Sequence, residues 1–291
     1  MVREMQQQGV PLTRACQRLE VARSTAYYRS RPRAAEPWAA RMVELAQAHP
    51  ACGYRKILHL LHREGWSINH KRFYRRWRDG GLAQRPPRSG RRHQRPTQPF
   101  DPAIPQRAGE VWALDFIQDR LTTGRAFRIL NVLDLYSRRA LDPLVDVSLP
   151  GPAVRDHLRR LFQREGAPAV LRRDDGPELR SRSVQQLLAE WRVADEVIPP
   201  GQPYDNGHME SFHSSQRREC LERELFDDIV EARMTVCLWT LRYNESRPHM
   251  ALAYRTPQEV WTESKRQEEN THFSPVQLEG AGPGRPNISS V

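Results

Sequence analysis

From residue 110 onward, apolar runs of strand length alternate with longer segments of helical periodicity. The strand-length runs cover residues 111–117, 127–135, 139–147, 169–171 and 193–198. The helical segments cover residues 152–165 and 183–191, and a third follows a Pro/Gly-rich turn, with Asp205 as its expected N-cap. Three strands, then a helix, a strand, a helix, a strand and a helix predict an α/β fold with a mixed antiparallel and parallel sheet.

Two segments of the N-terminal part are predicted to be helical. Residues 11–30 read as two short helices around a turn at 20–23, a helix-turn-helix pattern or a plain αα-hairpin. Residues 37–82 predict three more helices, the last capped by Asn69 and closed by Gly80 and Gly81. We therefore expect a helix-turn-helix-like segment at 1–35 and a helical DNA-binding domain at 36–83.

Positive charge is concentrated in this helical part. Residues 1–109 contain 22 Lys and Arg against 7 Asp and Glu, whereas the remaining 182 residues contain 24 against 28. A basic module joined to a near-neutral one is typical of proteins that bind a polyanion. A solvated basic face is the alternative. The candidate DNA contacts of the last helix in this part are Lys71, Arg72, Arg75, Arg76 and Arg78.

Residues 84–108 contain six Pro and six Arg and predict a basic linker between the two parts. Arg91 and Arg92 within it are further candidate DNA contacts. The Gly-, Pro- and Ser-containing residues from 263 to 291 are expected to form a flexible tail after a core at 109–262.

Several other classes of protein fit poorly. No apolar run reaches about 18 residues, the length that predicts a membrane-spanning helix, and the first ten residues lack the apolar centre of a signal peptide. Four cysteines without CxxC spacing favour a reducing cytosol. His49, Cys52, His59 and His62 resemble a zinc set, but a single Cys argues against that site.

Three acidic residues stand at the ends or centres of predicted core elements. Asp115 interrupts the apolar strand VWALDFI, where an unpaired carboxylate is costly. Asp174 follows the fourth strand, and Glu210 lies one turn into the helix after the fifth. Three carboxylates brought together would repel one another unless divalent cations neutralised them. Ligands that are all oxygen favour Mg²⁺ or Mn²⁺.

The sequence segments around these acids resemble those of a known family. WALDFI, RRDDGPEL and NGHMESFHSS are similar to the Asp-Asp-Glu motifs of the retroviral integrase superfamily, with 35 residues between the second and third acids. HPACGYRKILHLLHREGWSINHKRFYRRWRDGGL and YNESRPHMALAYRTPQEVW match B-frame transposases of the insertion-sequence group named after insertion sequence three. The resemblance implies an RNase H-like integrase core preceded by helix-turn-helix domains. It also implies Asp115, Asp174 and Glu210 as catalytic metal ligands.

The resemblance further implies metal-dependent DNA strand cleavage and strand transfer by two-metal phosphoryl transfer. Its expected partners are double-stranded DNA, other copies of the chain bound to that DNA, and an A-frame protein as a partner or fusion. Ser214 and Arg217, which follow Glu210 on its helix, would contact DNA. The chain departs from the group at Arg173, Asp175 and His213-Ser214-Ser215.

Two other functions are compatible with the same sequence. One is a catalytically inactive, DNA-binding remnant of a transposase. The other is an RNase H-type nuclease acting on hybrids, which leaves the helix-turn-helix blocks unexplained. His249, in the RPHMAL motif, is either structural or functional, and Asp134 is expected to be a turn or cap residue.

Overall fold

A computed structural model describes residues 1–27, 36–83, 102–199 and 206–272 of the 291-residue chain. The described residues form two compact units, Met1–Val43 and Glu44–Val291, and the division falls within helix α4 (Pro37–Ala48). In these ranges no helix is long and apolar enough to cross a membrane.

The first unit begins with three short helices, α1 (Val2–Gln7), α2 (Leu12–Arg18) and α3 (Arg23–Tyr27). Helices α2 and α3 correspond to the two helices predicted within 11–30, whereas α1 was not predicted. Ala15 and Cys16 on α2 are buried. The second unit begins within α4.

Helices α5 (Tyr54–Arg63) and α6 (His70–Asp79) confirm the helical pattern predicted for 53–79. The Asn69 side chain caps α6 as expected, because its Oδ1 accepts a hydrogen bond of 2.9 Å from the Lys71 amide. Phe73 and Trp77 are buried one turn apart, with ring centroids separated by 6.0 Å. The apolar side of α6 therefore faces inward, which leaves its basic residues exposed.

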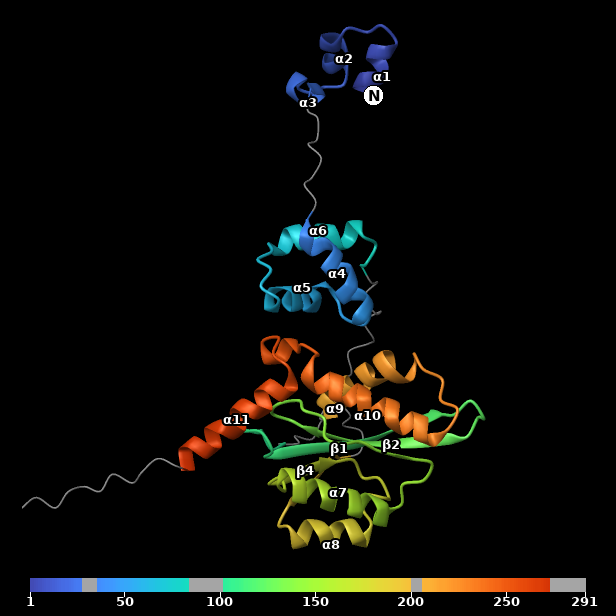
Figure 1. Ribbon diagram of the computed structural model, residues 1–291, viewed down its shortest axis with the longest axis vertical. Coiled ribbons are helices and arrows are strands. Elements are labelled where there is room, and N and C mark those ends of the chain that lie inside the picture. The colour runs from blue at the N-terminus through green and yellow to red at the C-terminus, as the bar shows by residue number, and fades with distance from the viewer. Residues whose placement is uncertain (28–35, 84–101, 200–205, 273–291) are drawn as a thin grey trace, which may run out of the picture. The chain divides into compact units, whose positions relative to one another are not determined.

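A five-stranded sheet with the order β3-β2-β1-β4-β5 forms the centre of the core (Figure 1). The strands are β1 (Val111–Arg120), β2 (Ala126–Asp134), β3 (Leu144–Asp146), β4 (Val170–Arg173) and β5 (Ala194–Val197). β1, β2 and β3 are antiparallel neighbours, whereas β4 runs parallel to β1 and β5 runs parallel to β4. The mixed sheet and the element order predicted from the sequence are both present.

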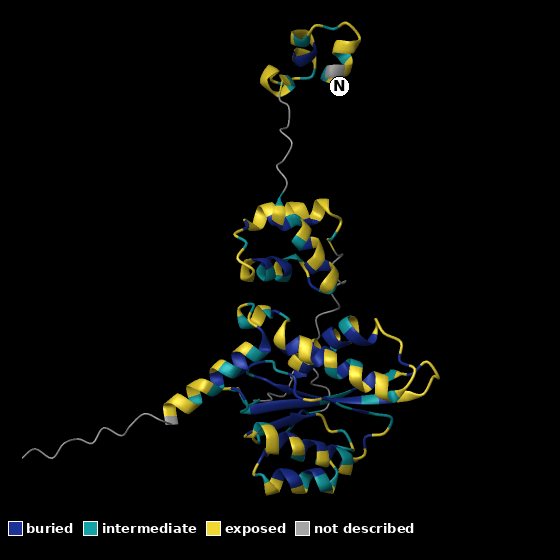
Figure 2. Cartoon of the chain, viewed as in Figure 1, coloured by how far each residue is buried: buried dark blue, intermediate teal, exposed yellow. Residues whose placement is uncertain are grey.

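Helices cover both faces of the sheet. Helices α7 (Gly151–Glu165) and α8 (Arg182–Glu190) pack on one face, while α9 (Gly207–Gln216) and α10 (Ile229–Glu245) pack on the other (Figure 1). Alternate residues of β1 point to opposite faces of the sheet. Ala113 packs into the hydrophobic core under α9 and α10, and Leu114 packs into the core under α7 and α8. Figure 2 shows the strands buried between helices whose outer sides are exposed.

The third strand is shorter than the sequence predicted. A strand was expected over 139–147, but β3 covers only Leu144–Asp146, and Ala140 forms an isolated bridge with Leu133. Pro143 lacks an amide hydrogen for the ladder, and residues 134–139 form a hydrogen-bonded turn. The antiparallel meander is therefore interrupted between β2 and β3.

Two boundaries differ from those expected. The linker was predicted to extend through residue 108, but Ala103 hydrogen-bonds to Glu196 and Arg172 of the sheet, and Ala108 is buried. The tail was predicted from residue 263, yet helix α11 (Pro257–His272) continues ten residues further. Both segments were misassigned because composition alone does not show which polar stretches pack against the core.

Candidate active site

Asp115 lies in the middle of β1 on the face covered by α9. Its side chain is 26% exposed, and its Oδ1 accepts a 2.7 Å hydrogen bond from the Phe116 amide. The alternation of β1 determines this orientation, since Ala113 and Ile117, two residues away on either side, belong to the α9–α10 core. The strand thus holds a partly open carboxylate among buried apolar neighbours.

Asp174 directly follows β4, the parallel neighbour of β1. Its Oδ1 accepts a 3.1 Å hydrogen bond from the Gly176 amide, and a Cβ at Gly176 would come within 3.1 Å of the same oxygen. The adjacent Asp175 instead forms an ion pair of 3.2 Å with Arg180. Of the two adjacent acids, only Asp175 has a cationic partner on its own loop.

Glu210 lies in the first turn of α9 and is exposed. The helix begins at Gly207 with Asn206 at the N-cap position. Asp205, the expected cap, lies outside the described residues. The Asn206 side chain turns toward β1, with its Nδ2 3.4 Å from Asp115 Oδ2. The start of α9 therefore lies beside the carboxylate of β1.

The three acids act on one another electrostatically. Burial, with smaller contributions from the negative charges of Asp174 and Glu210, raises the pKa of Asp115 to about 6, against the hydrogen bond from the Phe116 amide. Asp174 and Glu210, which lie 59 and 95 positions after Asp115 in the sequence, thus share one electrostatic site with it. That site attracts cations and disfavours its own ionisation.

Comparisons with known proteins identify the family of the chain. Two family models, both described as Integrase core domain, match residues 105–203 and 191–257, and a model described as HTH-like domain matches residues 35–90. The chain is 38% identical to a protein of insertion element IS407 from Burkholderia multivorans, over 84% of this chain and 88% of that one. The chain belongs to the insertion-element transposases that carry an integrase core domain.

Further similarities point to the same family. An insertion element IS476 protein of Xanthomonas euvesicatoria is 32% identical over 81% of this chain and 68% of its own length. Among solved structures, the catalytic core domain of BIV integrase matches 55% of this chain and 99% of its own, with 18% identity and a TM-score of 0.41. The mixed five-stranded sheet and the two Integrase core domain matches give the transposase core an RNase H-like integrase fold, as the resemblance implied.

His213 is a residue near the transposase acids that the sequence did not identify as part of the site. Its Nδ1 lies 3.8 Å from Asp115 Oδ2, and its Nε2 is buried without a hydrogen-bond partner among the described residues. Burial, reinforced by Arg217, lowers the pKa of His213 to about 4, so the imidazole is neutral near pH 7. Its position three residues after Glu210, on the same side of the helix, was the available signal.

A pair of buried amides fixes α9 against the sheet. Gln216 accepts a 2.7 Å hydrogen bond from Asn131 Nδ2 and donates one of 3.2 Å to Asn131 Oδ1. Asn131 is the cross-strand partner of Asp115 on β2. Both amide side chains are almost fully buried. The end of α9 is therefore anchored directly beside the central carboxylate.

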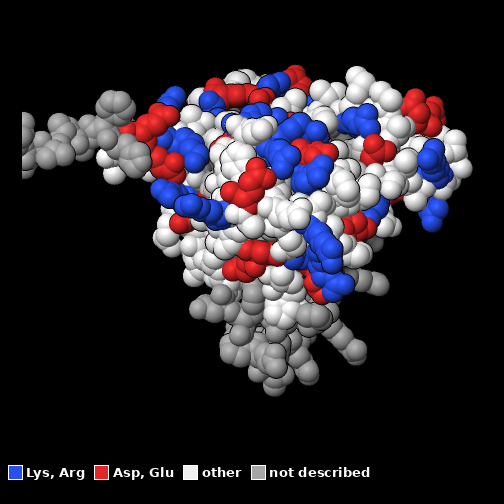
Figure 3. Space-filling model, turned by 90° about the horizontal axis from the view of Figure 1, so that it is seen from below, with Lys and Arg blue, Asp and Glu red and all other residues white. Residues whose placement is uncertain are grey.

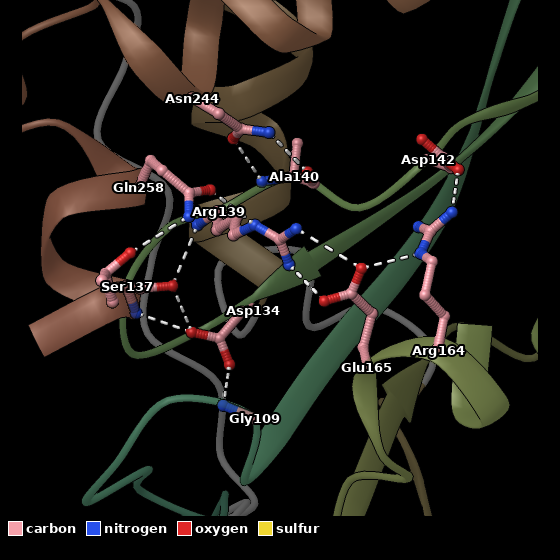
Figure 4. A network of polar contacts seen from close by, with 11 residues as sticks. Gly109, Asp134, Ser137, Arg139, Ala140, Asp142, Arg164, Glu165, Asn244 and Gln258 are labelled. Carbon is pink, nitrogen blue, oxygen red and sulfur yellow. Dashed lines mark hydrogen bonds and ion pairs between the residues drawn. The ribbon is translucent and has the colours of Figure 1, made fainter. Parts of the chain in front are cut away.

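Asp134, the other acid on the central strands, is a structural residue, as predicted. It is fully buried, and its Oδ1 accepts hydrogen bonds from the Ser137 amide and hydroxyl at 2.7 and 2.5 Å. Its Oδ2 accepts a 2.7 Å hydrogen bond from the Gly109 amide (Figure 4). One oxygen is therefore occupied by the turn that follows β2, and the other by the residue Gly109 that precedes β1.

Arg173, one of the departures from the group, has a structural explanation. Its guanidinium forms two 2.7 Å hydrogen bonds with Asp195 on the neighbouring strand β5, and the residue is only 3% exposed. The bidentate pair joins β4 to β5 immediately before Asp174. Arg173 therefore fixes the strand end from which Asp174 projects.

The candidate DNA contacts lie in separate places. Ser214 and Arg217 are exposed near the end of α9, and the five basic residues of α6 are also exposed. Arg91 and Arg92 lie outside the described residues. On the face of the core viewed from the α8 side, basic and acidic side chains alternate in small groups (Figure 3). That view shows no extended basic surface among the described residues.

The chemistry of the acids fits a hard divalent cation. Asp115, Asp174 and Glu210 offer only oxygen ligands, and their mutual repulsion is the term that a bound cation would remove. Within the described residues, no group of three His, Cys, Asp or Glu side chains is already gathered closely enough to hold an ion. Like charges without a counterion are expected to turn apart in this way.

Proposed function

We propose that the chain is a DDE-type DNA transposase that cleaves and joins DNA strands through metal-dependent phosphoryl transfer. Asp115, Asp174 and Glu210 are the proposed catalytic residues and ligands of two Mg²⁺ or Mn²⁺ ions. The observation that supports this proposal is that Asp174 and Glu210 both act electrostatically on Asp115, adding to the effect of burial on its pKa. Acids from β1, from the end of β4 and from α9 act on one another only because the fold brings them together.

In this proposal the protein provides position and charge. Divalent ions, when bound, would supply positive charge to the attacking and leaving oxygens of the phosphoryl group. Asp115 is held by β1 and by the Phe116 amide, Asp174 by the Gly176 amide, and Glu210 by a helix anchored through Gln216. The neutral His213 adds no positive charge that would compete with a cation for Asp115.

The helical part would hold the DNA while the core acts on it. Five exposed basic residues on one ten-residue helix are suited to phosphate contacts or to docking in a groove. We infer further contacts from Arg91 and Arg92, and from Ser214 and Arg217 near the acids. The partners would be transposon ends and target DNA, with several copies of the chain assembled on them and an A-frame protein as a possible addition. The site of action would be the bacterial nucleoid.

The test is strand cleavage and joining of a labelled double-stranded oligonucleotide in the presence of Mg²⁺ or Mn²⁺. Asp115→Asn should abolish both reactions while leaving DNA binding intact. Asp119→Asn, at a half-buried acid on the same strand, is the matched control and should remain active. Activity retained by Asp115→Asn would refute the assignment. DNA binding without cleavage by the unchanged chain would favour an inactive remnant, and cleavage of RNA–DNA hybrids without joining would favour a nuclease.

A further inference from the structure

An open cavity lies between α9, the turn after β2 and the segment after α10. Its floor is apolar, formed by Leu133, Phe212 and Tyr243. The polar groups around it are basic or hydroxylic, and among the described residues that line it there is no Asp or Glu. The basic residues are Lys56, Arg138, His208, Arg218, Arg247 and His249, and the hydroxyl groups include those of Ser211, Ser214 and Ser215. This composition suits an anion.

The positive charge of the cavity is only partly compensated. Glu219 is the carboxylate nearest to Arg247 and Arg218, at 2.8 and 3.8 Å. Arg138 lies near Asp134, whose two oxygens are already occupied by Ser137 and Gly109. Three guanidinium groups therefore share one carboxylate that is free to pair with them. Because the charges lie in a hollow with an apolar floor, their attraction for an anion is weakly screened.

Arg138 is held in place without a partner of its own. Its Nη1 atom is buried and has no hydrogen-bond partner among the described residues. Its backbone has a φ of +63°, which is unusual for a residue other than glycine. The turn is fixed on one side by Asp134 and on the other by paired hydrogen bonds of 2.8 and 2.9 Å between Ala140 and Asn244 (Figure 4).

An unpartnered guanidinium in a fixed turn is costly unless a ligand completes it. A buried cationic donor without an acceptor loses the hydrogen bonds that water would have provided. Burial lowers the pKa of Arg138, but an arginine remains charged at neutral pH. An oxyanion would satisfy its free N–H groups and neutralise its charge together.

His249 shows the same crowding of positive charge. Burial, followed by the charge of Arg247, lowers the pKa of His249 to about 3. The imidazole packs edge-on against Tyr243, at 4.8 Å between ring centroids, and its Nε2 lies 3.5 Å from Arg247 Nη1. The RPHMAL motif, whose role the sequence left open, therefore forms one wall of this cavity.

The position of the cavity on α9 relates it to the acids. At 100° per residue, Glu210 and His213 share one stripe of the helix, and Ser211 and Ser214 lie on the adjacent flank. A strand of nucleic acid crossing α9 at Glu210 would therefore reach the cavity next. A backbone phosphate beside the reacting one fits this geometry, with Arg138 as its main partner.

We propose that this cavity binds a phosphate of the DNA backbone close to the reacting phosphate. The inference rests on the proposed function, in which the chain acts on DNA. Arg138 would contact the phosphate directly, and Arg218, Ser211 and Ser214 would contact it from the rim. Arg247 is tied to Glu219 and Ser215, so it would act mainly by shaping the wall and adding charge.

The experiment measures binding of the full chain to a fluorescent double-stranded oligonucleotide across a series of salt concentrations. Each lost phosphate contact should reduce the slope of log K against log salt by about 0.9. Arg138→Gln and Arg218→Gln should each show this loss. Arg160→Gln removes an exposed charge on α7, across the sheet from α9, and should leave the slope unchanged. Arg218 is exposed in the π-helical segment Arg217–Leu221 that follows α9, so its variant remains informative if Arg138→Gln does not fold.

A second measurement distinguishes a cavity that binds DNA phosphates from one that binds only free anions. Inorganic phosphate should raise the melting temperature of the unchanged chain more than that of Arg138→Gln. An unchanged salt slope in both cavity variants would overturn the proposal, even if free phosphate still stabilised the chain. Asp115→Asn separates this failure from that of the proposed function. It should keep the full salt slope and lose cleavage, so continued cleavage would refute the active site and leave the cavity result standing.

Discussion

Replacing Asp115 by Asn should stabilise the chain in the absence of divalent cations. The folded protein holds the pKa of Asp115 near 6, above its ordinary value of 3.8, because burial and two neighbouring acids disfavour the carboxylate. A carboxyl whose pKa is higher in the folded than in the unfolded state lowers stability at any pH above both values. A shift of about two pKa units corresponds to about 3 kcal/mol at pH 8, at about 1.4 kcal/mol per unit.

The predicted gain depends on pH in a defined direction. Below the unfolded pKa both states are protonated and the penalty vanishes, and it grows as the pH rises from about 4 to 6. The advantage of Asp115→Asn should therefore shrink from about 3 kcal/mol at pH 8 to about 1 kcal/mol near pH 4.5. For a core of this size, the larger figure corresponds to a rise in melting temperature of about 6–12 °C.

Thermal melts with EDTA, at several pH values, measure this effect directly. Adding excess Mg²⁺ or Mn²⁺ should stabilise the unchanged chain and should have little effect on Asp115→Asn, because a ligand stabilises only the state that binds it. A variant that is neutral or less stable at pH 8 in EDTA would show that the carboxylate is not destabilising. The electrostatic argument for the site would then fail.

Three further substitutions test separate parts of the structure. Asp174→Asn should reduce strand cleavage at least about 100-fold. Asp175→Asn loses only an exposed ion pair with Arg180 and should remain active. If a cleavage assay instead finds Asp175→Asn inactive and Asp174→Asn active, the metal ligand is Asp175. Arg173→Met should lower the free energy of unfolding, measured in urea, by about 3 kcal/mol, because Asp195 loses its cationic partner. Adding Asp195→Leu to this variant should recover part of the lost stability. Unchanged stability of Arg173→Met would contradict a structural role for Arg173. Gln216→Leu should cost about 1–3 kcal/mol, since Asn131 would be left buried without its partner, and wild-type stability of this variant would show that the amide pair does not anchor α9.

The sequence predicted most of the core because its signals are local. Asp115 stands out as an acid within an apolar strand, and the alternation of β1 alone predicts that it shares a face with Ala113. Asn69 caps α6 as its position suggested. The start of β3 was misplaced because Pro143 and the Asp134 turn affect hydrogen bonding, which a hydrophobic pattern does not contain.

Contacts between distant segments could not be read in the same way. His213 could be assigned to the acid site only from the structure, which places α9 against β1 and brings His213 close to Asp115, 98 residues away in the sequence. Arg138 and His249 line the same cavity although 111 residues separate them, and neither motif carries a periodic signal. The sequence alone does not distinguish Asp174 from Asp175 as the candidate ligand. The ion pair between Asp175 and Arg180, seen in the structure, distinguishes them.

The pairing of Asn131 with Gln216 has a consequence for the electrostatic independence of the acid site. The anchor of α9 lies directly across the ladder from Asp115, where a Lys–Glu or Arg–Asp pair could have joined helix and sheet equally well. A buried ion pair at that distance would have placed fixed charges beside the carboxylate and biased both its ionisation and its attraction for cations. The neutral amides join helix and sheet without adding net charge. The affinity of the site can therefore be tuned by its own acids and by His213, independently of the contact that holds the helix in place.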